Sequence, residues 1–195
     1  MNKLPGPNQT LKLFLLLIGS KAPGRNVEQH DFFFGIAKEL KELVPAIKAF
    51  WPEAGDTLHI DAWREVTKVD GYKIAIGLKN EKEISENKLF FINLGGYQAH
   101  KLEEQHYTIL TVQTNRALAI SEAKKTTFFT TNTLKGATSH IDDKYGIDVD
   151  DVYQVEDILI PEHKSKYSVI ISKEEEEEVE EDEIHPGYLK LSRMK

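Results

Sequence analysis

Four of the seven histidines in the chain stand at repeated positions, and each of them has an acidic residue two positions away. On a β-strand, residues i and i+2 face the same side, so each pair presents an imidazole beside a carboxylate. The four pairs are Glu28–His30, His59–Asp61, Glu104–His106 and His140–Asp142. Imidazole and carboxylate groups are ligands of zinc, manganese and iron, and together they also form a general acid–base pair.

These pairs predict a site only if the strands that carry them lie close together. If the two strands of one half of the chain are neighbours, the residues of the first two pairs converge on one point, as a metal or acid–base site requires. The alternative is structural, because a histidine at a strand end often hydrogen-bonds backbone groups and an acid beside it can cap a turn. A divalent metal is therefore a candidate cofactor, and no cofactor is firmly implied.

A loop after the first predicted strand offers a weaker candidate site. It contains Gly19-Ser20-Lys21 and Gly24-Arg25-Asn26, which combine small residues, backbone amides and two cations. Lys21 and Arg25 are therefore candidate anion-binding residues, although their spacing fits neither the Walker motif nor the dinucleotide fingerprint. The alternative is an ordinary surface loop in which Arg25 pairs with Glu28. No nucleophile elbow motif is present, so a hydrolase triad has no support.

The elements that must position these residues occur twice in the sequence. Residues 12–30 and 88–106 align without a gap at an offset of 76, with seven of nineteen positions identical. Unrelated segments of this length share roughly one identity, so the match indicates an internal repeat. The triplet His-Ile-Asp also recurs, at 59–61 and 140–142, which gives an offset of 81. The sequence therefore predicts a tandem duplication.

The repeat also decides the nature of the apolar run near the start of the chain. The run LFLLLI at 13–18 precedes Ser-Lys-Ala and has features of a secretory signal. Because a similar run recurs at 88–94, inside the chain, we predict instead that both runs are inner strands of a fold. The protein is then expected to keep these residues and to act in the cytoplasm.

Each copy is expected to contain a strand, a second strand, a helix and two further strands, which gives an α+β fold. Because each copy alone is small, we expect the two copies to pack as an internal pseudo-dimer. The predicted segments are a flexible N-terminus at 1–11, copy one at 12–78, a linker at 79–87, copy two at 88–160, an extra strand at 161–173, and an acidic tail with the C-terminal end at 174–195.

The charge of the 195-residue chain is concentrated near its end. The formal net charge is −7, but removing the nine acids at 174–183 from the total of 32 leaves 23 acids against 25 bases. We expect this run to be disordered and the end beyond it to be frayed. No concentrated basic face suggests nucleic-acid binding, and no apolar run approaches the ~20 residues of a membrane span. With no cysteine, disulfides and thiolate metal sites are excluded.

Three separated segments, GRNVEQHD, PAIKAFWPEA and LHIDAWREVTKVDGYKI, together resemble a bacterial family known as domain of unknown function 1543. The resemblance covers residues 12–77 well and the second copy more loosely. It implies the domain boundary and a tandem arrangement, and it implies no activity, since none is established for the family. The second copy departs from the pattern, because GRN becomes His100-Lys101-Leu102 and Trp63 becomes Lys144.

Two hypotheses of different classes follow from these observations. The leading one is a cytoplasmic, non-enzymatic binding or interaction protein, built from two related units, whose partner is an unidentified protein or small molecule; self-association into a homo-oligomer is a further option. The lack of any complete catalytic motif favours it. The alternative is a metal-dependent or acid–base enzyme that uses the repeated Glu-x-His and His-x-Asp pairs.

Overall fold

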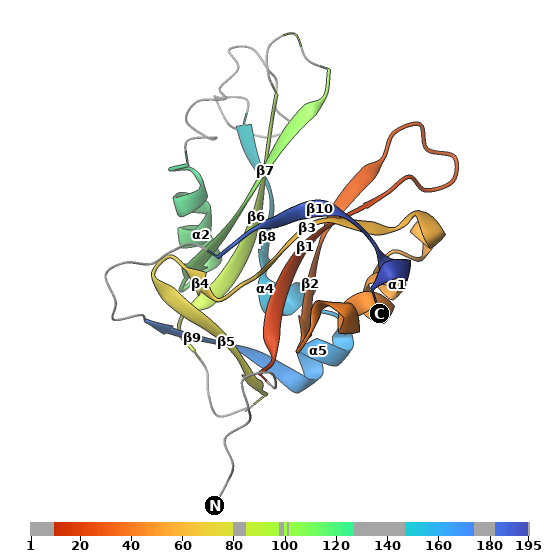
Figure 1. The fold of residues 1–195 in the computed structure, drawn as a ribbon. Helices are drawn as coiled ribbons and strands as arrows, with labels where there is room; N and C mark the ends of the chain where they lie inside the picture. Colours follow the sequence, from red (N-terminus) through yellow and green to blue (C-terminus); the bar gives the residue numbers. More distant parts are fainter. Residues whose placement is uncertain are drawn as a thin grey trace, which may run out of the picture. The chain divides into compact units, whose positions relative to one another are not determined.

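A computed structural model of the chain describes residues 10–79, 85–97, 100, 102–126, 147–173 and 182–194 (Figure 1). The chain forms two compact units. The first unit comprises Met1–Glu83 and Leu159–Lys195, and the second unit comprises Ile84–Ile158. The last part of the chain therefore returns to complete the first unit, which the predicted segments did not anticipate. No helix in the described parts of the chain is both long enough and apolar enough to cross a membrane.

The first unit is built on a four-stranded antiparallel sheet with the strand order β10-β3-β1-β2 (Figure 1). Its strands are β1 (Lys12–Ser20), β2 (Gln29–Ala37), β3 (His59–Glu65) and β10 (His185–Lys190). The predicted strand at 12–18 is confirmed as part of β1, which is buried along nearly its whole length. Burial on both faces explains the unbroken apolar run, because an inner strand has no solvated side.

Short helical segments connect β2 to β3 and pack against the alternate residues Phe14, Leu16 and Ile18 of β1. They are η1 (Leu40–Leu43), α1 (Val44–Phe50) and η2 (Pro52–Thr57). The helical segment ends at Leu43 and restarts at Val44, beside a proline. Pro45 lies in the first turn of α1, where the missing N–H of proline leaves no intrahelical bond unmade.

A second sheet of the first unit has the order β4-β5-β9. Its strands are β4 (Lys68–Val69), β5 (Tyr72–Leu78) and β9 (Tyr167–Lys173). Asp70 and Gly71 form the hairpin turn between β4 and β5, with φ values of 52° and 75° that suit the twist of a two-residue hairpin. The predicted extra strand at 161–173 is correct only in its second half, since Pro161–Lys166 forms the helix α5. Proline at the first position favours a helix start there.

The predicted frayed C-terminal end is wrong for residues 182–194. Strand β10 pairs with β3, and η3 (Leu191–Arg193) follows it and places Leu191 in the core with 3% exposure. Two physical reasons explain why this segment is structured rather than frayed. Burial of apolar side chains such as Leu191 is favourable, and β10 pairs with an edge of β3 that would otherwise be open. The part of the acidic run at 174–181 lies outside the described residues.

The second unit contains a three-stranded antiparallel sheet with the order β7-β6-β8. Its elements are β6 (Lys88–Tyr97), β7 (Glu104–Gln113), α2 (Arg116–Ala123), β8 (Ile147–Gln154) and α4 (Val155–Ile158). Helix α2 packs on the sheet through the fully buried Ala119 and Ala123. Among the described residues, α2 is followed by one strand and one short helix, rather than by the two strands that the repeat pattern predicts.

The first hairpins of the two units pair with the same register. Gly19 of β1 lies opposite His30 of β2, and Gly95 of β6 lies opposite His106 of β7. The offset of 76 that relates the two sequence segments therefore also relates the two hairpins.

His163 attaches α5 to the edge of the main sheet of the first unit, because its Nδ1 accepts a hydrogen bond of 3.1 Å from the backbone N–H of Ile36 in β2. A protonated imidazole cannot accept this bond. Burial lowers the pKa of His163 from its ordinary value of 6.5, Lys166 lowers it further, and Glu162 opposes the shift. A histidine whose pKa is lowered in the folded state stabilises the fold above pH 6.5, and this stability is lost as the pH falls below that value.

We therefore expect the protection factor of the Ile36 amide, which corrects for the intrinsic pH effect on exchange, to fall as the pH is lowered from 7 through the folded-state pKa of His163. The protection factor of Leu118, whose N–H is bound by the Asn115 side chain, should not change in this way. Hydrogen exchange followed by NMR measures this. The variant His163→Asn keeps a hydrogen-bond acceptor but removes the group that titrates. It should therefore abolish the acid-induced change at Ile36. Equal acid sensitivity in this variant would count against the assignment.

Candidate functional site

Four predicted site residues meet over one glycine of the first unit. The prediction required neighbouring strands, but β2 and β3 lie on opposite sides of β1. His30 and His59 both lie opposite Gly19 in the pairing of their strands with β1. Because glycine has no side chain, groups from the two flanking strands can reach each other above it.

The distances between these side chains define a compact cluster. His59 Nε2 lies 2.6 Å from Glu28 Oε1 and 3.2 Å from Asp61 Oδ1, and His30 Nε2 lies 3.2 Å from Asp61 Oδ2. Glu28, His59 and Asp61 each offer one potential ligand atom, and these three atoms all lie within 4.8 Å of one another. This cluster of Glu28, His30, His59 and Asp61 is called the Gly19 cluster below.

The geometry leaves no room for a side chain at position 19. A Cβ atom there would lie 2.4 Å from Asp61 Oδ2, 2.7 Å from His59 Nε2 and 3.1 Å from Glu28 Oε1. The sequence alignment of the two copies matched Gly19 with Gly95, but the role of the glycine was missed. A glycine at the same place in both copies was the signal that could have revealed it.

A β-bulge lies at Asp61. Leu17 pairs with Ala62 and Ile18 pairs with Ile60, so Asp61 is the extra residue of β3 at this point. Bulges re-aim side chains and are frequent next to functional sites. Ile60, which stands between His59 and Asp61, lies in the core, so these two residues share the other face of β3, as the i, i+2 spacing predicts.

The orientation of His59 is fixed by its backbone surroundings. Its Nδ1 lies 2.8 Å from the carbonyl oxygen of Thr57, which can only accept a hydrogen bond, so Nδ1 donates. Thr57 is in turn held by its hydroxyl group, which lies 2.7 Å from the buried Ser20 Oγ and 2.7 Å from the carbonyl oxygen of Ala54. The other ring nitrogen, Nε2, then faces the two carboxylates.

One atom of His59 and one atom of Asp61 are buried and make no hydrogen bond in the described part of the chain. His59 Nε2 and Asp61 Oδ2 have no hydrogen-bond partner among the described residues. Each lies within ion-pair distance of an opposing side chain, but these approaches lack the geometry of a hydrogen bond. The His59 side chain is only 5% exposed, whereas 41% of the Glu28 side chain is exposed. The cluster thus has a buried imidazole and a face open to solvent.

Strand β10 contributes an aromatic wall that sequence reasoning also missed. The ring of Tyr188 lies 4.3 Å from the ring of His59, measured between centroids, and His185 stacks on Trp63 at 4.1 Å. Gly187 has a φ of 145°, a conformation that favours glycine and that precedes Tyr188 directly. No pattern in the sequence connects residues 185–188 to His59, because strand pairing between distant segments leaves no local signal.

The described residues of the second unit do not repeat the Gly19 cluster. Glu104 and His106 take the places of Glu28 and His30, but His106 is half exposed and lies 3.3 Å from the amide of Asn93 and 3.9 Å from Glu104. The other pair predicted for this unit, His140–Asp142, lies outside the described residues.

The pairing of β8 corrects the predicted alignment of the two copies. The residue opposite Gly95 in β8 is Asp148, whereas the residue opposite Gly19 in β3 is His59. The strands β3 and β8 are therefore related by an offset of 89, and the predicted offset of 81 is wrong. At 89, an aspartate replaces His59, and Val152 rather than Lys144 replaces Trp63.

The predicted anion-binding residues Lys21 and Arg25 lie in the loop between β1 and β2, and both are exposed. Arg25 forms a turn through its backbone N–H, 3.2 Å from the carbonyl oxygen of Ala22. The alternative in which Arg25 pairs with Glu28 is not seen, since Glu28 contacts His59 instead. Anion binding at this loop stays a prediction.

The fold and the cluster together define the class of protein: an α+β protein with a histidine–carboxylate cluster over the inner strand of an antiparallel sheet. Residues 25–76, which include the Gly19 cluster apart from the glycine itself, match the model of the family described as Domain of Unknown Function (DUF1543). This match supports the family resemblance for the first unit.

A solved structure has a similar fold. The crystal structure of a protein Il1583 from Idiomarina loihiensis matches with a TM-score of 0.63 and 24% sequence identity, over 93% of this chain and 98% of that chain. No curated protein matches this chain.

Proposed function

We propose that the first unit binds one divalent transition-metal ion, with His59 Nε2 and the carboxylates of Asp61 and Glu28 as ligands. The observation that carries this proposal is the buried Nε2 atom of His59, which lies beside two carboxylates and has no hydrogen-bond partner among the described residues. An unsatisfied buried polar atom costs about 1–3 kcal/mol. A cation between the three groups removes this penalty and also neutralises the two carboxylates.

The types of ligand and their spacing suit such an ion. Zinc binds imidazole nitrogen and carboxylate oxygen at about 2.0–2.2 Å, so two ligand atoms on a tetrahedral ion are about 3.4 Å apart. The atoms of the cluster lie within 4.8 Å of one another, with the shortest approach at 2.6 Å, so small movements suffice. The Nδ1–H of His59, bound to the Thr57 carbonyl, is the outer-shell contact that orients a metal-binding imidazole. Nitrogen with oxygen ligands favours zinc, iron or manganese.

His30 has a supporting role in this proposal. Its Nε2 contacts Asp61 Oδ2 at 3.2 Å, and its side chain is 46% exposed. It therefore orients Asp61 and closes part of the solvent side, and the remaining positions of the ion face water. Three protein ligands with an open position are typical of metal sites that activate water or polarise a substrate. The geometry thus favours the metal-dependent alternative over the leading hypothesis of a binding module without a metal.

We also infer that the two units arose by duplication and that only the first unit kept this site. What supports the duplication is the shared register of the two hairpins and the bulge at the same place beside β1 and β6. The replacement of the imidazole by Asp148 at the register position of His59 removes the ligand that distinguishes the first site. Packing of the units as a pseudo-dimer, and a cytoplasmic location, remain expectations.

Metal binding is tested by titrating metal-free protein with Zn²⁺, Mn²⁺ and Co²⁺ in a calorimeter. We expect one tight site per chain, its loss in the variant His59→Ala, and a roughly 10- to 100-fold weaker affinity in His30→Ala, as is typical for an outer-shell residue. The matched control is His106→Ala, which removes the counterpart of His30 in the second unit and should leave the affinity unchanged.

Two results would overturn the proposal. One is the absence of tight binding of any of the three ions. The other is binding that persists in His59→Ala but disappears in His106→Ala, which would place the ion in the second unit.

A further inference from the structure

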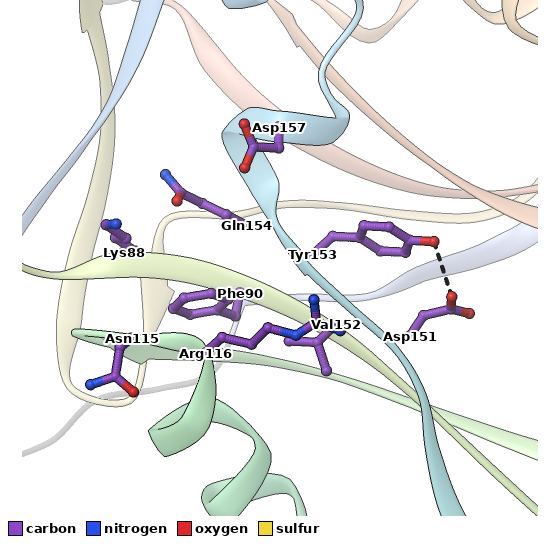
Figure 2. A pocket seen from close by; sticks show the side chains of 9 residues that line it. All are labelled: Lys88, Phe90, Asn115, Arg116, Asp151, Val152, Tyr153, Gln154 and Asp157. Carbon is purple, nitrogen blue, oxygen red and sulfur yellow. Dashed lines mark hydrogen bonds between the residues drawn. The ribbon is translucent and has the colours of Figure 1, made fainter. Parts of the chain in front are cut away.

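The second unit has a cavity of about 460 Å³ (Figure 2). Figure 2 shows that its lining side chains come from β6, the start of α2, β8 and α4. Phe90 provides a buried apolar surface, and Lys88 and Arg116 provide cationic groups. The volume lies in the range of small-molecule sites, about 300–1,000 Å³.

The first unit shows what normally occupies this place. There, Trp63 of β3 packs against the core, and its ring centroid lies 6.0 Å from that of Phe14. By strand register, Phe90 corresponds to Phe14 and Val152 corresponds to Trp63. The second unit therefore has the same phenylalanine but lacks the indole that covers it, and the missing volume contributes to the cavity.

The first helical residue after the second strand also differs between the two units, and this difference too leaves the second unit with less apolar side-chain volume. In the first unit it is Leu40, which packs against the core. In the second unit it is Arg116, which is exposed and follows the N-cap residue Asn115. An apolar residue that fills the core is thus replaced by a cation at the rim of the cavity.

A third difference removes a counter-ion. In the first unit, Lys12 forms an ion pair with Glu65. The corresponding residues of the second unit are Lys88 and Gln154, so the carboxylate is replaced by an amide. Among the described residues, neither Lys88 nor Arg116 forms an ion pair.

The carboxylates beside the cavity are engaged within the protein. Asp151 accepts hydrogen bonds from Tyr153 Oη at 3.0 Å (Figure 2) and from the amide of Asn93 at 3.5 Å. Asp157 also takes part in an interaction within the chain. Lys88 and Arg116 are therefore the cationic groups of the cavity, and neither has a charged partner in the described part of the chain.

We propose that this cavity binds a small organic anion whose carboxylate or phosphate group contacts Arg116 and Lys88 and whose apolar part packs on Phe90 and Val152. The guanidinium group suits either anion, because its N–H groups pair with two oxygens of a carboxylate or phosphate. The three differences between the units, at Trp63, Leu40 and Glu65, all act to create such a site. This inference is independent of the metal site, which lies in the first unit.

The test uses the full chain freed of metal, so that an anion bound through an ion is not mistaken for this site. The probes are benzoate and phenyl phosphate, with inorganic phosphate and benzylamine for comparison, and binding is followed by NMR chemical-shift titration. We expect an aromatic anion to shift the signals of Phe90 and Val152 with a measurable Kd, and benzylamine not to do so. Comparison of the two aromatic anions shows which acidic group the site prefers.

Two variants restore the residues of the first unit. Arg116→Leu and Val152→Trp should each weaken the binding of the aromatic anion about tenfold or more. Lys125→Leu, which removes a cation from just beyond the end of α2 where it pairs with Glu122, should leave it unchanged. Arg116 is exposed, so its variant remains informative if Val152→Trp fails to fold.

Equal binding by wild type and Arg116→Leu would overturn the proposal, as would the failure of both aromatic anions to bind at millimolar concentration. Binding of inorganic phosphate as tightly as phenyl phosphate would also contradict it, because the apolar part of the ligand would then contribute nothing.

Discussion

The substitution Gly19→Ala should reduce the affinity of the first unit for a divalent metal by at least about 100-fold while the unit stays folded. The added methyl group would lie within 3.1 Å of all three proposed ligand atoms, from Glu28, His59 and Asp61. The two carboxylates are partly exposed and can rotate toward solvent, whereas His59 is held by Thr57. The clash is therefore relieved by separating the ligands, and the strand pairing of β1 is retained.

Calorimetric metal titration measures the loss, and circular dichroism checks the fold. The matched control is Gly95→Ala at the corresponding register position of β6, which should leave metal affinity unchanged. Unchanged affinity in Gly19→Ala would show that the ion, if bound, does not lie between these three side chains. Loss of the folded signal would instead indicate that the methyl group cannot be accommodated by movement of the carboxylates.

The residues of this cluster were predictable, whereas the way they meet was not. The internal repeat marked Glu28 and His30, and the spacing to the carboxylate marked His59 and Asp61. A regular strand pairing of β2 with β3 was the expected arrangement, but β1 lies between them. The convergence depends on the missing side chain of Gly19 and on the register in which β2 and β3 pair with β1, and this register is not visible in local sequence.

The second copy shows the limit of alignment within one sequence. The hairpins at 12–37 and 88–113 share seven identities in their first parts, so their offset of 76 was found and agrees with the register. The third strands lie beyond connections of different length, and there a chance recurrence of His-Ile-Asp gave the wrong offset. Three identical residues are too few to fix a register, since a shift changes every pairing.

The C-terminal segment was misjudged for a related reason. Nine acids at 174–183 indicate a solvated run, and the prediction extended this state to the end of the chain. Residues 185–190 have no continuous apolar pattern, and their burial arises only where β10 meets β3. Composition predicts which segments lack a core of their own, but it does not show which segments join the core of another.

The substitution Leu191→Ala should lower the free energy of unfolding of the first unit by about 2–4 kcal/mol. Leu191 is 3% exposed and belongs to the same core as Phe14 and Ile60. Its truncation removes buried methyl groups and leaves a cavity, because a close-packed core relaxes only in part. An effect of this size from a residue so near the C-terminus would establish that the last strand is a structural part of the unit.

Urea unfolding followed by tryptophan fluorescence measures this effect in the first unit alone, because the chain has two tryptophans and both, Trp51 and Trp63, lie in that unit. The matched control is Leu78→Ala, the same substitution at a position of the same unit that is 78% exposed, which should change stability by less than about 0.5 kcal/mol. Equal midpoints for Leu191→Ala and wild type would contradict the docking of β10 and η3. Since Tyr188 of β10 lies against His59, undocking of this strand would also remove one wall of the metal site, so stability and metal affinity should fall together in Leu191→Ala.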